Sequence, residues 1–222
     1  TVKWQYVKDK SDASGQDAGW VDYVIFTSST QAGSNATLYF PHVDTSLPWQ
    51  TEIAIINTSD QTVIGTLKAF SDEGQLVETK DVTLPARGRR QIGIADEFIN
   101  HTSIAYIIFD TTSAAVQGYA KFSREGYYRA AIPAVKEINT ADIHISHIAS
   151  TGDWWTGVSL VNTTSAPKVL TITFNTGQSR FITLTANQHR AFDIAREFFD
   201  NQPPPDIQSA VIANASGVIG LA

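Results

Sequence analysis

Hydrophobic and polar residues alternate over short stretches of this chain, which is the pattern of strands buried on one side. Between residues 170 and 174, Leu, Ile and Phe alternate with two threonines, so the three apolar side chains share one face. Residues 82–84 and 182–184 each place a threonine between two aliphatic residues. Turn-forming segments separate the apolar runs, at residues 72–74, 175–177 and 216–217. The pattern predicts an all-β fold built from β-sandwiches.

The alternation also predicts where the elements lie. In the first half of the chain we expect strands at residues 37–43, 51–57, 62–70, 75–84, 88–94, 104–110, 114–122 and 127–132. Single helical turns are expected at residues 95–100 and 195–201. Residues 203–205 are three prolines, which we expect to end the second helical turn because proline cannot continue a helix.

The chain contains an internal repeat. Residues 41–58 align with residues 146–163 without a gap, at an offset of 105. Residues 82–98 align with residues 182–198 at an offset of 100, with 8 of 17 positions identical. The offset changes around residues 71–74, which predicts a shorter hairpin in the second copy, since loops accept deletions. A period near 100 residues is the size of an independent module.

These alignments predict three segments. We expect one β-sandwich repeat at residues 37–135 and a second at residues 136–222, with the linker beginning near residue 135. Nothing in the second copy corresponds to residues 121–132, so its last strand is expected to be missing. Residues 1–36 have no counterpart in the repeat and are expected to form the terminal hairpin of a preceding module.

Two resemblances accompany this division. Residues 4–9 read W-x-Y-x-K-D, a Ser/Gly-rich loop follows, and residues 17–22 read D-x-G-W-V-D. This segment resembles the closing strands of a jelly-roll module related to laminin-G-like or MAM-like domains, which implies that most of that jelly roll lies upstream. The repeat pattern H-[IV]-x, a short loop, then W-x-T-x-[IL]-x-[IL]-[IV]-N-x-[ST] resembles a module of large extracellular bacterial proteins. That resemblance implies a secreted or cell-surface location and carries no activity.

Composition excludes several kinds of function. The net charge is −6, and the basic cluster of Arg87, Arg89 and Arg90 is too short to follow a phosphate backbone, so nucleic acid is not an expected partner. The chain has no cysteine, which excludes disulfides, zinc–thiolate sites and thiol catalysis. No apolar run approaches the about 20 residues that a membrane helix needs, so membrane insertion is not expected.

No known catalytic motif is present: there is no G-x-S-x-G, H-E-x-x-H, P-loop or G-x-G-x-x-G sequence. The five histidines are scattered, at His42, His101, His144, His147 and His189. His42 and His147 occupy one repeat position, which favours a structural role over catalysis. Glu97 and Glu197 are also equivalent, and we expect them to orient a short helix or to pair with Arg90 and Arg190. We therefore expect no catalytic residues and no enzyme activity.

A metal site is considered only in the acidic N-terminal loop. Asp9, Asp12, Asp17 and Asp22 supply oxygen ligands of the kind that Ca²⁺ prefers. Their spacing lacks the D-x-[DN]-x-[DN]-G pattern of a calcium loop, so a solvated turn is favoured. No metal and no cofactor are expected.

The candidate ligand-binding residues are Trp49, Trp154 and Trp155, which lie in or beside the loop that opens each repeat. Exposed indole rings on such a loop can stack on sugar rings, which would make a polysaccharide a partner. The alternative is a ring folded over the end of the core, which the equivalence of Trp49 and Trp154 favours. Trp155 is extra and is the better candidate for exposure.

Five N-x-[ST] sequons occur, at Asn35, Asn57, Asn100, Asn162 and Asn214. Asn57 and Asn162 are equivalent and are followed by turn residues. We expect their role to be hydrogen bonding at a strand end rather than glycan attachment.

Taken together, the sequence favours a non-catalytic structural or adhesive segment of a secreted multi-module protein. Its expected partners are neighbouring modules or further copies of itself. Residues 217–222 are apolar and uncharged, so their edge is expected to accept an added strand, which would build a filament. The alternatives are a carbohydrate-binding module and an accessory region of a secreted hydrolase.

Overall fold

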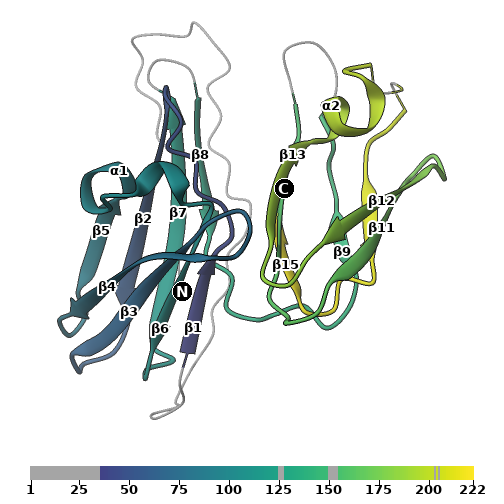
Figure 1. Cartoon of the computed structure of the whole chain (residues 1–222). Helices are drawn as coiled ribbons and strands as arrows, with labels where there is room; N and C mark the ends of the chain where they lie inside the picture. The colour runs from purple at the N-terminus through teal and green to yellow at the C-terminus, as the bar shows by residue number, and fades with distance from the viewer. Residues whose placement is uncertain (1–35, 125–127, 150–154, 203, 205) are drawn as a thin grey trace, which may run out of the picture. The chain divides into compact units, whose positions relative to one another are not determined.

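The computed structural model describes residues 36–124, 128–149, 155–202, 204 and 206–222. These residues form four antiparallel sheets with two short α-helices and one 3-10 turn, so the prediction of an all-β fold is confirmed (Figure 1). The sheets form two pairs, and each pair encloses its own cluster of buried apolar side chains. We call the two pairs the N-terminal and the C-terminal sandwich.

The N-terminal sandwich consists of two four-stranded sheets, in the orders β1-β6-β3-β4 and β5-β2-β7-β8. Its strands are β1 (Ala36–Phe40), β2 (Trp49–Asn57), β3 (Val63–Phe70), β4 (Leu76–Leu84), β5 (Arg89–Gly93), β6 (Tyr106–Thr111), β7 (Val116–Arg124) and β8 (Tyr128–Pro133). Helix α1 (Ile94–Glu97) and the 3-10 turn η1 (His101–Ser103) connect β5 to β6. All eight strands lie within three residues of the expected positions.

The C-terminal sandwich has sheets in the orders β12-β11-β14-β9 and β13-β10-β15. Its elements are β9 (Ile143–Ile145), β10 (Gly157–Asn162), β11 (Lys168–Phe174), β12 (Ser179–Leu184), β13 (His189–Asp193), α2 (Ile194–Phe199), β14 (Ala210–Ala213) and β15 (Val218–Leu221). Helix α2 ends before the prolines that were expected to stop it. Asp200 ends it by adopting a left-handed conformation, with φ of 50°.

The strand order is the same in both sandwiches. The sheet β1-β6-β3-β4 corresponds strand by strand to β9-β14-β11-β12, and the strands β5-β2-β7 correspond to β13-β10-β15. Strand β8 has no counterpart among the described residues, and β15 is therefore the outer strand of its sheet. The division into repeats at residues 37–135 and 136–222 and the addition of a strand at β15 both stay predictions.

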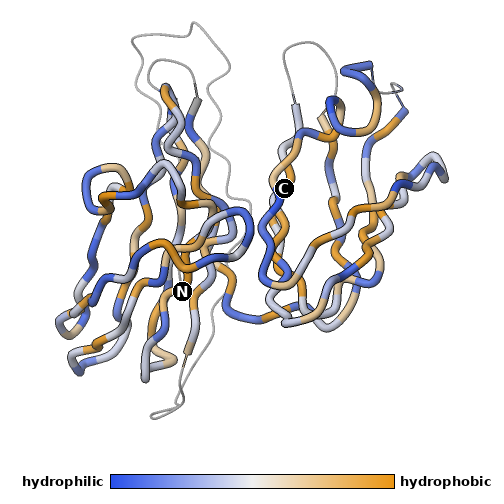
Figure 2. The backbone as a smooth tube through the Cα atoms, in the orientation of Figure 1, coloured by the Kyte–Doolittle hydropathy of each residue, from blue (hydrophilic) through white to orange (hydrophobic). Residues whose placement is uncertain are grey.

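Hydrophobic and hydrophilic residues alternate along strands of both sandwiches (Figure 2). In β11, Leu170 and Ile172 are fully buried, whereas Val169, on the opposite face of the same strand, is 57% exposed. The two cores are filled differently at one position. Gly65 lies so close to the buried ring of Phe109 that a Cβ atom there would be 2.4 Å from the ring.

The C-terminal sandwich has a leucine, Leu170, at the position that corresponds to Gly65. Gly65 pairs with Val82 and Leu170 pairs with Ile182, and these partners are equivalent in the repeat alignment. The strand beside Leu170 carries Ile212 where the N-terminal sandwich carries Phe109. A small residue beside a large ring in one core thus corresponds to two aliphatic residues of intermediate size in the other.

Candidate functional site

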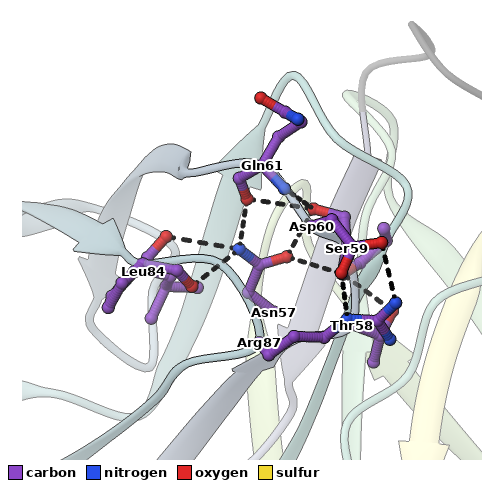
Figure 3. A network of polar contacts seen from close by, with 9 residues as sticks. Asn57, Thr58, Ser59, Asp60, Gln61, Leu84 and Arg87 are labelled. Atoms are coloured by element: carbon purple, nitrogen blue, oxygen red, sulfur yellow. Dashed lines mark hydrogen bonds and ion pairs between the residues drawn. The ribbon is translucent and has the colours of Figure 1, made fainter.

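Buried asparagines close the end of one strand in each sandwich. Asn57, the last residue of β2, is 1% exposed. Its Nδ2 donates to the carbonyl oxygens of Gln61, Leu84 and Pro85, at 2.7, 3.3 and 2.9 Å (Figure 3). Its Oδ1 accepts from the backbone N–H and the hydroxyl of Ser59, at 2.9 and 2.8 Å. Every hydrogen-bonding atom of this side chain is therefore used within the protein.

Asn162 repeats these contacts at the end of β10. Its Nδ2 donates to the carbonyl oxygens of Ala166 and Thr185, each at 2.8 Å. Its Oδ1 accepts from the N–H and the hydroxyl of Thr164, at 3.0 and 2.8 Å. In these two N-x-[ST] motifs, the hydroxyl of the third residue donates a hydrogen bond to the buried asparagine. This contact agrees with hydrogen bonding at a strand end rather than glycan attachment.

The threonine of the W-x-T pattern also has a local structural contact in both sandwiches. The hydroxyl of Thr51 donates to the carbonyl oxygen of Asp44 at 2.8 Å and accepts from its N–H at 2.9 Å. Thr156 makes the same two contacts with Ala149, at 3.2 and 2.8 Å. One side chain therefore closes the loop that precedes each first central strand.

The candidate tryptophans are not gathered at one site among the described residues. Trp49 is half-buried at the start of β2, opposite Arg124. Trp155 is 50% exposed, and its ring lies over Gly157, where a Cβ atom would be 2.6 Å from the indole. Trp154 lies outside the described residues. The ring best placed to meet a ligand is that of Trp155.

The remaining charged residues named from the sequence lie partly inside and partly outside the described ranges. Arg90 pairs with Glu97 at 3.3 Å and Arg190 pairs with Glu197, as expected. The acidic loop at residues 9–22 and the sequon at Asn35 lie outside the described residues. Over the described ranges, no group of three or more His, Asp or Glu side chains is placed to hold a metal ion. In the same ranges, no helix is long and apolar enough to cross a membrane.

The main polar cluster lies where the two sandwiches touch, and the sequence had not indicated it. An apolar part is formed by Ala105 and Tyr106 of the N-terminal sandwich and by Val161 and Ile219 of the C-terminal sandwich. All four are at most 6% exposed. We call this contact surface, together with the polar residues described next, the joint.

Within the joint, His189 connects three residues that are distant in the sequence. Its Nδ1 lies 2.6 Å from Oδ1 of Asp72, and its backbone N–H donates to the carbonyl oxygen of Asp72 at 2.8 Å. Its Nε2 lies 3.0 Å from the hydroxyl of Ser159. The side chains of His189 and Ser159 are both buried, at 3% and 1% exposure. The order Ser–His–Asp is the order of a hydrolase triad, so the direction of each hydrogen bond decides what this array can do.

The hydrogen bond between Ser159 and His189 has the opposite direction to the serine–histidine bond of a triad. The Ser159 hydroxyl donates its one proton to the carbonyl oxygen of Pro41, at 2.6 Å. It must therefore accept from Nε2 of His189, while Nδ1 donates to the Asp72 carboxylate. The hydrogen bond from His189 holds the pKa of Asp72 below its usual value. All these contacts are satisfied together only when both ring nitrogens of His189 carry protons.

This arrangement does not prepare Ser159 for nucleophilic attack. A triad histidine accepts the serine proton, whereas here that proton is directed to a backbone carbonyl and the hydroxyl is buried. What the array does is join polar groups across the joint, with the imidazole of one sandwich hydrogen bonded to the carboxylate of the other. The imidazole of this pair is buried but the Asp72 side chain is 68% exposed, so the contact fixes relative position more than it adds stability.

His42 adds a second imidazole to the joint. Its Nδ1 lies 3.4 Å from Nε2 of His189, and the two rings are stacked with centroids 5.5 Å apart. Burial, and then the nearby charge of His189, lower the pKa of His42 to about 4. The repeat-equivalent His147 is exposed, so the two histidines do not share one structural role.

The turn between β3 and β4 reaches across the joint. Gly74 in this turn has a φ of 77°, and a Cβ atom there would lie 2.4 Å from the carbonyl oxygen of Asn187. Tyr106 donates its hydroxyl to the same carbonyl oxygen at 3.0 Å. Because Asp72 belongs to this turn, the hairpin that is longer in the first copy supplies the carboxylate of the joint.

Comparing the two repeats gives no clear signal for the joint. The outer face of β13, β10 and β15 carries His189, Ser159, Val161 and Ile219. The positions that correspond to them in the N-terminal sandwich are Arg89, Ala54, Ile56 and Gln117. That face also carries a polar chain in which Glu52 bonds Gln91 and Lys121. Only one of these four pairs sets an apolar residue of the C-terminal sandwich against a polar one of the N-terminal sandwich, Ile219 against Gln117, so the two faces differ too little to mark a covered surface.

The comparisons with known proteins add little to this description. No protein-family model matches the chain, and no curated protein matches it significantly. Among solved structures, the crystal structure of Thermotoga maritima 1070 is similar with a TM-score of 0.39 and 15% sequence identity. That similarity covers 48% of this chain and 97% of the other. A likeness at this level supports no inference about function.

Proposed function

We propose that this chain is a non-catalytic structural or adhesive segment of a secreted or cell-surface protein, in which two tandem sandwich modules act as one unit. The observation that carries the proposal is the joint. Its polar core uses the Ser159, His189 and Asp72 side chains, which would otherwise be the best candidates for chemistry, to connect the sandwiches.

A spacer must transmit position from one module to the next, which requires a fixed contact rather than a free linker. The joint offers both an apolar part and a charged pair with specified geometry. A contact of this composition suits a segment that presents other modules at a set orientation. Function would then reside in sites carried by the rest of the protein.

The proposal is tested by measuring the distance between the sandwiches. The chain lacks cysteine, so spin labels at Thr79→Cys and Thr183→Cys, both exposed, are uniquely placed. We expect a narrow distance distribution for the otherwise unchanged protein. Val161→Asp, which buries a charge in the joint, is expected to broaden that distribution severalfold.

The matched control is Val169→Asp, at an exposed position of the C-terminal sandwich, which should leave the distribution narrow. A broad distribution in the unchanged protein would contradict the proposal. Covalent labelling of Ser159 by a fluorophosphonate would contradict its non-catalytic part, since only an activated serine reacts with such a probe.

A second candidate function is favoured by the exposed ring of Trp155. If the segment binds polysaccharide through this ring, Trp155→Ala should weaken retention on insoluble polysaccharides by about fivefold, because aromatic stacking on a sugar contributes about 1 kcal/mol. Phe181→Ala removes another exposed ring, 73% exposed on β12, and serves as the control. Equal retention of both variants and the unchanged protein would exclude Trp155 as the binding ring.

A further inference from the structure

Two imidazoles face each other across the joint, one from each sandwich. We propose that the pair formed by His42 and His189 makes the joint acid-sensitive, so that the sandwiches separate in mildly acidic solution while each remains folded. The proposal concerns the joint alone and does not depend on the presence of a ligand.

The geometry allows one proton, and not two, between the rings. Nδ1 of His42 and Nε2 of His189 are 3.4 Å apart, and the proton on His189 is also directed to the Ser159 hydroxyl at 3.0 Å. His42 must therefore present an unprotonated nitrogen to this proton. Protonating His42 as well would stack two cations with ring centroids 5.5 Å apart, in a site where His189 is 3% exposed.

The carboxylates near His42 do not offset this repulsion. Asp72, in the β3–β4 turn, is already hydrogen bonded to His189. Asp44, in the loop of His42 itself, accepts from the N–H of Ser46 at 2.8 Å. From β7, His42 meets the uncharged ring of Phe122, with centroids 5.4 Å apart. The titratable groups near His42 are thus His189, Asp72 and Asp44. Of these three, only His189 lies within hydrogen-bonding distance of the His42 ring.

The direction of the pH dependence follows from the pKa of His42. In the joined form burial and His189 lower it to about 4, against an ordinary value of 6.5 once the sandwiches separate and the ring meets water. The separated form therefore binds the proton on His42 more readily, so the contribution of His42 to the joint is present above about pH 6.5 and is lost as the pH falls toward 4. Linkage predicts that the ratio of separated to joined forms rises by about a hundredfold at pH 4.

Asp72 acts in the same direction at lower pH. Its pKa is lowered by the hydrogen bond from His189, so its contribution is present above the ordinary carboxyl range and is lost as the pH falls through the lowered value. Of these two groups, His42 accounts for the response between about pH 6.5 and 4, and Asp72 responds at lower pH.

The experiment follows the spin-label distance between Thr79→Cys and Thr183→Cys from pH 7.5 to pH 3.5, with circular dichroism recorded on the same samples. We expect the distribution to broaden below about pH 5 while the β-sheet signal is unchanged. His42→Asn keeps an acceptor for the His189 proton but cannot titrate, so its midpoint should move down by at least one pH unit. His147→Asn, at the exposed equivalent position, should behave like the parent protein.

Three results would overturn the proposal. The first is a narrow distribution that persists at pH 3.5 in the parent protein. The second is loss of the β-sheet signal before any broadening, which would mean that the joint is not the first part to yield. The third is a His42→Asn variant that separates at the same pH as the parent.

Discussion

Asn57→Asp is expected to lower the free energy of unfolding by about 3–4 kcal/mol at pH 7. The substitution keeps the size of the side chain but removes both N–H donors, so the carbonyl oxygens of Gln61, Leu84 and Pro85 each lose one hydrogen bond. The carbonyl oxygens of Gln61 and Pro85 still accept from the Ser59 hydroxyl and the Gly88 N–H. Each lost hydrogen bond contributes about 1 kcal/mol, and the new carboxylate would face these carbonyl oxygens in a buried site, which adds to the cost. Urea unfolding followed by circular dichroism measures the change.

Two further variants show whether the effect comes from the network. Asn162→Asp should cost a similar amount, because Asn162 repeats the contacts in the other sandwich. Asn214→Asp changes an exposed asparagine of a third sequon and should alter the free energy of unfolding by no more than about 0.5 kcal/mol. If Asn57→Asp were as mild as Asn214→Asp, the network would not be a major source of stability.

Gly65→Leu is expected to destabilise the protein by at least about 3 kcal/mol, and Phe109→Ile is expected to rescue part of that loss. A leucine at position 65 would overlap the Phe109 ring and the Asp110 carbonyl oxygen, since even a Cβ atom lies within 2.6 Å of both. The double variant reproduces the pair that the C-terminal sandwich uses, Leu170 beside Ile212. A double-mutant cycle in urea should therefore give a favourable coupling of about 1–3 kcal/mol.

The cycle needs a pair that does not share this contact. Phe109→Ile and Leu170→Val change residues in different cores that do not contact each other. Their effects on the free energy of unfolding should therefore add within about 0.5 kcal/mol. Strict additivity of Gly65→Leu and Phe109→Ile would mean that the close approach at Gly65 does not limit the packing of this core.

Strand positions were predictable because alternation is a local property. The side-chain period of two is encoded within five to nine residues, and tertiary contacts did not override it in β3, β4 or β11. The role of Asn57 was predictable for the same reason, since its hydroxyl partner lies two residues away. The helix end was misjudged because a left-handed residue, Asp200, can stop a helix without proline.

The joint was not predictable in the same way. Asp72 and His189 are 117 residues apart, and Ser159 and Pro41 are 118 residues apart. No local pattern reports on such pairs, and His189 stands at a position where the first copy has an exposed arginine.

The different filling of the two cores bears on how a tandem chain avoids misfolding. Two sandwiches with the same strand order in one chain can exchange strands while folding. If β3 paired with β14, Gly65 would meet Ile212 and leave a void. If β11 paired with β6, Leu170 would meet the Phe109 ring and overfill the core. Each wrong pairing is penalised, so this one pair of positions favours pairing of each strand within its own copy.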